Sequence, residues 1–485
     1  MTSKLLRTKP MTLIMDDTQV EGRRLRRALT AWDLTAIGIG CIIGVGIFVL
    51  PGVEAAMHAG PGIILSFAIA SIACACSALC YAELAAMIPV SGSAYTYGYA
   101  TLGEIFGWII GWDLILEYMV AAILVATGWS AYFVNLLRSG FGFTLPRVIT
   151  ASPFEKAPGL LNLPAVAIVL VITWLLARGI KESSRVNLTI VVIKLAVVLF
   201  FIVVTVGHVD PAKWQPFLPF GFKGVITAAS IVFLAYVGFD AVSTTAEEAK
   251  NPQRDLPIGI MASLVVATVL YMAVAAIMTG VVPYKNLGVA DPVALVLNTL
   301  KMPLASAVVS VGAIAGITSV LLVLIMGQPR ILFAMSRDGL LPRVLSRVHP
   351  RHKTPHVTTW MTGGIVAVAA ALTPINVSAE LCSIGTLFAY IIVAAGVIVL
   401  RYTRPDIPRA FKAPLSPVLP GLGIALCAYL MMSLPRVTWY RFLVWLVIGL
   451  IIYFSYGSRK SLLNSPKAPG HPEAVAPDQQ PRLGA

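Results

Sequence analysis

Long uncharged runs of hydrophobic residues recur along the whole chain, and short polar or Pro/Gly-rich segments separate them. A helix needs about 20 apolar residues to cross the hydrocarbon core of a bilayer. We divide these runs into twelve segments of this kind, from 30–56 near the start to 439–456 near the end. The pattern predicts an all-α polytopic membrane protein with twelve transmembrane helices.

Glycines interrupt the first predicted helix, where Gly38, Gly40, Gly44 and Gly46 fall within nine positions. Each glycine lowers helix propensity by roughly 1 kcal/mol relative to alanine. Because an opened backbone inside a membrane needs protein, ligand or water partners, the stretch is a candidate binding site. The alternative is close helix packing through the motif Gly40-x-x-x-Gly44. The spacing does not fit a dinucleotide-binding loop.

A second interruption is expected in the sixth predicted helix, which turns polar after Val237-Gly238. The two interrupted helices each open a block of five, at 30–207 and 223–401. Five is an odd number, so the two blocks enter the membrane from opposite sides. Inverted repeats with paired broken helices point to a binding site near the bilayer midplane. The last two predicted helices, within 416–457, follow the repeats.

Composition and charge fit this class of protein. Of the 485 residues, 58% are hydrophobic and 12% are charged, whereas soluble domains carry about 25% charged residues. Most of the basic residues behind the net charge of +14 fall in the terminal segments and in the connections on their side of the membrane. The positive-inside rule then predicts a cytoplasmic-membrane protein with both termini in the cytoplasm. It would have a basic arm at 1–29 and a disordered tail at 458–485.

Other partners and activities find little support in the sequence. The basic groups suit an anionic lipid surface, so we expect the lipid bilayer and no nucleic acid as a partner. All six cysteines lie in apolar runs, and no histidine accompanies Cys74, Cys76 and Cys80 at a metal-ligand spacing. No nucleophile–base pair stands out in any predicted helix. The sequence therefore predicts no enzyme, no catalytic residue, no metal and no cofactor.

Several motifs resemble the amino acid–polyamine–organocation superfamily, and within it the bacterial members of the cationic amino acid transporter branch. The matching stretches are GIGCIIGVGIFVLPG from Gly38, YAELAAMIPVSGSAYTY from Tyr81, GEIFGWIIGWDLILEY from Gly103, YVGFDAVSTTAEEAKNPQRDLPIGI from Tyr236 and GQPRILFAMSRDGLLP from Gly327. The resemblance implies a leucine-transporter-type fold, with five plus five inverted helices and two more. It also implies secondary transport of amino acids.

The first break is expected to hold the carboxylate of an amino acid. Freed N–H groups of Ile43, Gly44, Val45 and Gly46 begin the second half-helix, where the helix dipole favours an anion. The resemblance implies substrate contacts from the backbone of Ile42, Val45 and Gly46. Many relatives have Ser or Thr where this chain has Val45, so only the backbone role carries over.

The second break is expected to hold the ammonium group. A half-helix that ends there leaves carbonyl groups unpaired. The resemblance implies that the carbonyls of Leu234, Ala235 and Val237 contact the ammonium and that Phe239 lies at the substrate site. Asp240 is either a proton-coupling residue or the cap of the following half-helix.

Lys194 lies near the middle of the fifth predicted helix, in Val-Val-Ile-Lys-Leu-Ala-Val-Val. A lysine at bilayer depth costs about 2.5–3.5 kcal/mol, and its mid-span position makes snorkelling to the interface difficult. The resemblance implies that its ammonium occupies the position of sodium in sodium-coupled relatives, near backbone carbonyls around Gly44 and the hydroxyl of Ser319. Loss and return of its proton would couple transport to protons. Glu117 is a second protonatable candidate, or else hydrogen-bonds to a neighbouring helix.

Leu324 is the candidate that limits substrate size, because relatives that carry arginine or lysine have a small residue there. We therefore predict proton-coupled, sodium-independent uptake of small or medium neutral L-amino acids by alternating access. A cationic amino acid permease or exchanger is one alternative, and an amino acid sensor without transport is another. The sequence predicts no particular accessory subunit.

Overall fold

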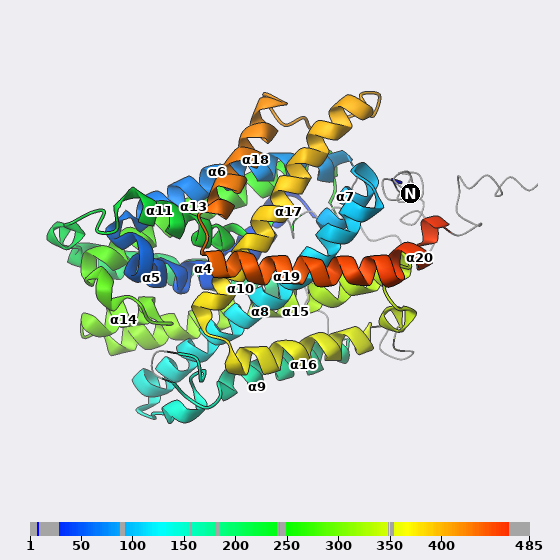
Figure 1. Cartoon of the computed structure of the whole chain (residues 1–485). Helices are drawn as coiled ribbons and strands as arrows, with labels where there is room; N and C mark the ends of the chain where they lie inside the picture. The colour runs from blue at the N-terminus through cyan, green and yellow to red at the C-terminus, as the bar shows by residue number, and fades with distance from the viewer. Residues whose placement is uncertain are drawn as a thin grey trace, which may run out of the picture.

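The computed structural model describes residues 7–8, 29–87, 93–155, 158–179, 184–239, 242, 249–347, 349 and 354–464. The regular secondary structure of this part of the chain is helical (Figure 1). Two isolated β-bridges also occur, and neither belongs to a strand. Seven stretches are long and apolar enough to cross a bilayer. Their main helices are α6 (Ile63–Met87), α8 (Glu104–Phe141), α10 (Ser184–Thr205), α13 (Pro252–Val281), α15 (Pro303–Arg337), α17 (Ile375–Thr403) and α19 (Arg436–Ile452).

Five shorter apolar helices accompany the long ones. They are α3 (Ala31–Ile42), α9 (Leu163–Ala177), α11 (Gly221–Val232), which continues as the 3₁₀ turn η6 (Phe233–Tyr236), α16 (His356–Leu372) and α18 (Val418–Met432). Smaller helices lie between them, namely α4 (Val45–Phe48), α5 (Leu50–Glu54), α7 (Ser93–Thr101), α14 (Pro292–Thr299) and α20 (Ser458–Lys460). Together these elements form a polytopic helical membrane protein.

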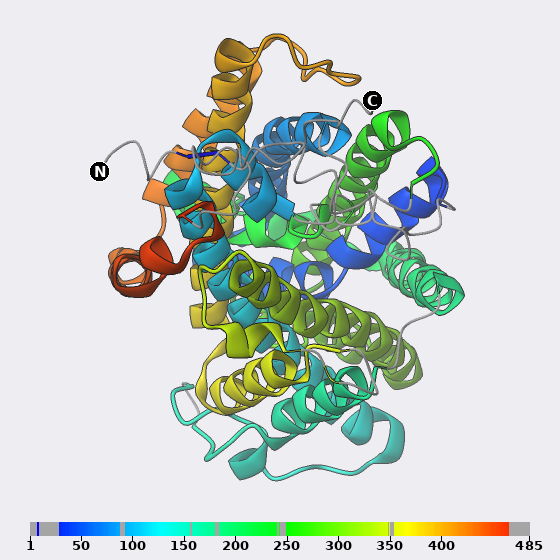
Figure 2. The ribbon, with the colours of Figure 1, turned by 90° about the vertical axis from the view of Figure 1, so that its right-hand side faces the viewer.

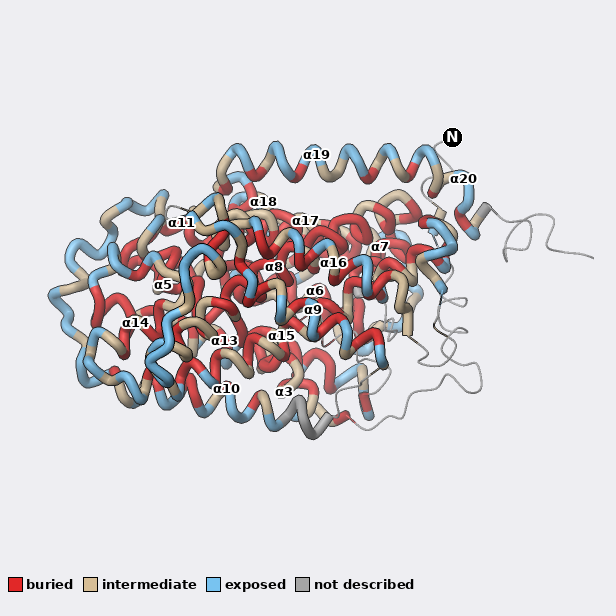
Figure 3. Tube along the Cα trace, turned by 90° about the horizontal axis from the view of Figure 1, so that it is seen from below, coloured by how far each residue is buried: buried red, intermediate tan, exposed pale blue. Residues whose placement is uncertain are grey.

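Many of the helices run side by side along one direction, which Figure 1 shows from the side and Figure 2 more nearly end-on. The centre of the bundle is formed by α8, which packs against α15 and α17. Buried residues concentrate on these helices, whereas much of α19 and of the connecting loops is exposed in Figure 3. The exposed residues of α19 include many large apolar side chains, as expected of a surface that faces lipid.

Segments near both termini meet at one end of the bundle, which we call the terminal end. Arg7 Nη1 donates to the carbonyl of Leu463 at 3.3 Å, and the N–H of Glu104 donates to the carbonyl of Arg7 at 3.0 Å. The opposite end, which carries α14, we call the far end. The predicted tail from 465 onward, and almost all of the predicted arm at 1–29, lie outside the described residues.

The chain leaves helical geometry at two places inside the bundle. Between α3 and α4, Ile43 is extended and Gly44 has φ −150° and ψ −130°. After η6, Val237 is extended and Gly238 has φ +123°, a conformation that favours glycine. A β-carbon on Gly238 would lie 2.9 Å from the carbonyl carbon of Cys41. The two interruptions are therefore in direct contact.

Candidate functional site

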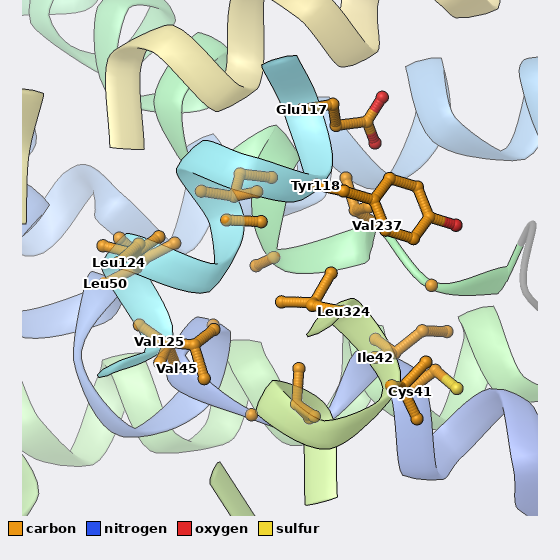
Figure 4. A pocket seen from close by; sticks show the side chains of 18 residues that line it. Cys41, Ile42, Val45, Leu50, Glu117, Tyr118, Leu124, Val125, Val237 and Leu324 are labelled. Carbon is orange, nitrogen blue, oxygen red and sulfur yellow. The ribbon is translucent and has the colours of Figure 1, made fainter. Parts of the chain in front are cut away.

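A pocket lies between the two helix breaks, with α8 and α15 as its other walls (Figure 4). Including its open mouth, it encloses about 700 Å³. Its lining residues are Cys41, Ile42, Gly44, Val45, Gly46, Leu50, Glu117, Tyr118, Ala121, Leu124, Val125, Leu234, Ala235, Val237, Gly238, Val320, Val323 and Leu324. Concave sites with mostly apolar walls and a few polar groups are typical of small-molecule binding.

Backbone groups are the main polar groups on the two walls that the helix breaks form. Gly44, Val45 and Gly46 lie at the start of α4, where the first N–H groups of a helix lack partners within it. On the opposite wall, η6 ends beside Val237. The carbonyl of Leu234 accepts the N–H of Val237, and the carbonyls after it have no following helical turn to pair with. An amino acid has a carboxylate and an ammonium group that match these two sets of donors and acceptors.

Tyr271 on α13 links the two breaks. Its hydroxyl lies 2.8 Å from the carbonyl of Ile42 and 2.7 Å from the carbonyl of Ala235. One O–H group can donate to one of these carbonyls at a time. Gly46 permits the same close approach, since a β-carbon there would lie 2.7 Å from that of Ala235. Sequence reasoning missed Tyr271, because a tyrosine in an apolar run carries no signal that it joins two helix ends.

The side-chain walls of the pocket are largely apolar. Leu324 points toward the middle of the pocket from α15, opposite Glu117 and Tyr118 of α8 (Figure 4). Apart from Glu117 and Tyr118, the lining side chains are aliphatic or a thiol. The site is therefore suited to an apolar substrate side chain.

Exposure differs between the two ends of the pocket. Toward the terminal end, Cys41 and Val237 are partly exposed. Toward the far end, Leu50 is buried, and Tyr132 donates a hydrogen bond to the carbonyl of Phe48 and is itself fully buried. The described residues thus close the pocket more tightly toward the far end.

Lys194 lies behind the first break and not among the pocket-lining residues. Its side chain is fully buried, and its ammonium donates to the carbonyls of Gly40 at 2.5 Å and Ile43 at 3.1 Å. A β-carbon on Gly316 of α15 would lie 2.9 Å from Lys194 Cγ, and Ser319 donates its hydroxyl to the carbonyl of Gly316. The ammonium thus pairs with carbonyls that the end of α3 leaves over.

The structure brings together most of the residues that the sequence singles out. The pocket lining includes Ile42, Gly44, Val45, Gly46, Leu234, Ala235, Val237, Leu324 and Glu117. Ile43 instead turns its carbonyl to Lys194, and Phe239 packs against Tyr81 and Tyr390. Ser319 donates its hydroxyl to the carbonyl of Gly316, the residue that packs against Lys194, and Asp240 lies outside the described residues.

Comparison with known proteins gives matches over nearly the whole chain. A family described as amino acid permease matches residues 29–454. The branched-chain amino acid permease BcaP of Bacillus subtilis is 54% identical, over 91% of this chain and 95% of that protein. The methylthioribose transporter of the same organism is 48% identical, over 95% of this chain and 100% of that protein. The vacuolar cationic amino acid transporter 4 of Arabidopsis thaliana is 39% identical, over 79% and 64% respectively.

Proposed function

The chain belongs to the amino acid permease family, and from this we propose that it takes up small or medium neutral L-amino acids in symport with protons and without sodium. It is a membrane transporter and not an enzyme. The observation that carries the proposal is the pocket between the two helix breaks, with backbone donors on one wall and backbone acceptors on the other. These donors and acceptors match the carboxylate and the ammonium group that all amino acids share.

Neutral substrates are favoured by the rest of the pocket. A cationic side chain needs a carboxylate or several carbonyls at its tip. Glu117, which we assign to proton coupling, is the one carboxyl group in the described lining, and the walls around Leu324 and Val323 are aliphatic. The relative BcaP is named for branched-chain amino acids, whose aliphatic side chains suit such walls. Leucine, isoleucine and valine are therefore the first substrates to test.

Proton coupling is proposed for Lys194, with Glu117, Ser319 and Asp240 as the other candidate residues. Lys194 is fully buried and contacts the carbonyls of Gly40 and Ile43 at the end of α3, where the first break begins. Loss of its proton would weaken these contacts and so change the backbone at the first break. Because the substrate would bind on the opposite side of that break, its affinity would change too. An ammonium in this position also repels sodium, which supports independence from that ion.

Twelve crossing helices provide the proposed frame, with inverted repeats at 30–207 and 223–401 and two further helices in 416–457. Seven long stretches and five shorter apolar helices support this number. Alternating access would come from movement of one repeat against the other. The basic segments support a cytoplasmic-membrane location with the terminal end in the cytoplasm.

A second candidate substrate comes from the methylthioribose transporter, which matches this chain over its full length. Methylthioribose is a neutral thioether sugar, so it shares an apolar group with the branched-chain amino acids. It has no carboxylate and no ammonium, and it would leave the backbone groups of both breaks without charged partners. We therefore rank it below the neutral amino acids.

Competition uptake in proteoliposomes tests these assignments together. Uptake of radiolabelled L-leucine would be measured with excess isoleucine, valine, alanine, arginine or methylthioribose, and with pH and sodium gradients imposed separately. We expect competition by the neutral amino acids and stimulation by the pH gradient alone. Competition mainly by arginine would favour a cationic permease or exchanger, and competition by methylthioribose alone would favour the sugar. Binding without uptake would favour a sensor.

A further inference from the structure

A second buried carboxyl group lies one helical turn from the pocket. Asp113 and Glu117 are four residues apart on α8, so they lie on the same face of that helix. Glu117 lines the pocket, and Asp113 lies one turn toward the terminal end. The two residues are 0% and 2% exposed. Asp113 and Glu117 therefore form a pair of acidic side chains that extends from the pocket toward the terminal end.

The surroundings of Asp113 do not explain it as a structural residue. Neither of its carboxyl oxygens has a hydrogen-bond partner within the described residues. A β-carbon on Gly385 of α17 would lie 2.9 Å from Asp113 Oδ1, so the carboxyl group lies against bare backbone. The neighbouring titratable groups are Glu117 itself and Cys382 of α17, whose thiol donates to the carbonyl of Glu117. From α15, the uncharged side chain of Gln328 donates to the carbonyl of Ile115, in the turn between the two acids.

Glu104 shows what a structural carboxylate on the same helix looks like. It is also buried, but it accepts hydrogen bonds from the hydroxyls of Tyr99, Tyr453 and Ser461. Buried polar groups in folded proteins are normally satisfied in this way, and exceptions call for a functional explanation. Asp113 is such an exception.

Two carboxyl groups at this spacing influence each other strongly. An ionised carboxylate is costly to bury without a partner, and two like charges close together in a poorly polarisable interior are more costly still. A proton held by the pair is therefore shared between its two members, and the position of that proton depends on what occupies the pocket beside Glu117.

We propose that Asp113 is a proton-relay residue that exchanges the transported proton with Glu117, between the pocket and the terminal end. In this step an O–H bond of one carboxylic acid breaks and an O–H bond forms on the carboxylate of the other, so the total charge of the pair stays the same. The proposal rests on the proposed proton-coupled function and adds to it a group that does not touch the pocket.

The test compares Asp113→Asn with the wild type and with Glu104→Gln, in proteoliposomes that contain a pH-sensitive dye. Glu104→Gln is the matched control, because it removes a buried carboxylate from the same helix away from the pocket. For Asp113→Asn we expect leucine exchange within about twofold of the wild type, whereas net pH-driven uptake and the accompanying proton flux fall by about tenfold or more. Asp113→Glu should restore part of the proton flux.

Each outcome has a distinct meaning. If the wild type takes up leucine with a pH gradient and Asp113→Asn does so equally well, the relay is wrong and the proposed function stands. If exchange and net uptake fall together and Asp113→Glu restores neither, Asp113 is structural. If the wild type shows no pH-driven uptake of any panel substrate, the proposed function fails and the relay fails with it.

Infrared difference spectra provide a test that does not depend on the transport rate of a variant. We expect a protonated-carboxyl band that shifts when substrate is added and that is absent from Asp113→Asn or Glu117→Gln. A spectrum without any substrate-dependent change in protonated carboxyl groups would overturn the relay.

Discussion

At the scale of single residues, Lys194 carries the most specific prediction. Lys194→Met should reduce pH-driven leucine uptake in proteoliposomes by about tenfold or more, because the variant has no proton to lose. It also leaves the buried carbonyls of Gly40 and Ile43 without their donor, at a cost of about 1–3 kcal/mol in folding free energy.

Lys213 provides a matched control for that prediction. Its ammonium also donates to a backbone carbonyl, that of Val281, but it lies in a connection at the far end. Lys213→Met should leave pH-driven uptake close to the wild-type rate. Wild-type-like pH-driven uptake by Lys194→Met would show that Lys194 has no part in coupling.

Leu324 carries the prediction on substrate range. Leu324→Ser removes most of an aliphatic side chain from the middle of the pocket, so longer and cationic amino acids should compete with leucine for uptake. Leu322→Ser is the control, since Leu322 lies on the same helix outside the pocket lining. Inhibition constants for arginine and lysine would be compared. An unchanged range in Leu324→Ser would move the size limit to another residue.

Residues differ in how far their roles can be predicted from sequence. Lys194 and Glu117 stand out because a charge in a long apolar run is costly and needs a reason. Tyr271 and Val320 are ordinary residues for such runs, and only the packing of α13 and α15 shows what they contact. That the carboxyl oxygens of Asp113 lack hydrogen-bond partners among the described residues is a structural observation, which its place in the sequence does not give.

At the scale of elements, the contact between the two breaks should be sensitive to one added methyl group. Gly46→Ala would place a β-carbon 2.7 Å from that of Ala235 and 3.0 Å from the hydroxyl of Tyr271. Since real β-carbons do not approach so closely, α4 and η6 must separate. We expect substrate affinity to fall by about tenfold or more, because overpacking of this kind costs about 1–3 kcal/mol.

Gly364→Ala is the matched control for that element. A β-carbon on Gly364 of α16 would meet no atom within 4 Å, and alanine favours a helix by about 1 kcal/mol. Its leucine affinity, measured by scintillation proximity, should equal that of the wild type. Equal affinity in Gly46→Ala would contradict the close approach of the two breaks.

The breaks were predictable to different degrees. Four glycines within Gly38–Gly46 mark the first break, because several poor helix formers act together. The second break is expected from the polar turn after Val237-Gly238, but the 3₁₀ turn over Phe233–Tyr236 that precedes it has no such mark in the sequence. The direct contact between Gly238 and Cys41 comes from tertiary packing, so it could not be derived from local sequence.

At the scale of the whole molecule, Asp291 links stability to pH. It precedes α14 at the far end, and burial raises its pKa from 3.8 to about 6, although Arg138 opposes the shift. The folded protein then binds this proton more tightly than the unfolded chain. Its contribution to stability is therefore full below pH about 4 and is lost as the pH rises through about 6.

Asp291→Asn should remove this part of the pH dependence. The thermal midpoint of the purified protein would be measured between pH about 4 and 7, and the variant should change less over this range. Asp210→Asn, at an exposed position of the same end, should behave as the wild type does. A midpoint in Asp291→Asn that follows the wild-type curve would exclude Asp291 as the group that titrates.

The two ends of the pocket also matter at this scale. The far end is closed by buried residues such as Leu50 and Tyr132, whereas residues toward the terminal end are partly exposed. With the terminal end in the cytoplasm, as we propose, this arrangement corresponds to a conformation closed to the outside. Alternating access requires a second conformation in which the relation is reversed.

The most direct test of the proposed mechanism is the initial rate of L-leucine uptake by proteoliposomes under an imposed pH gradient, with and without a protonophore and in the absence of sodium. We predict uptake against the leucine gradient that stops when the protonophore collapses the pH gradient and that does not change when sodium is added. Uptake that depends on sodium, or that is unaffected by the protonophore, would contradict proton-coupled transport.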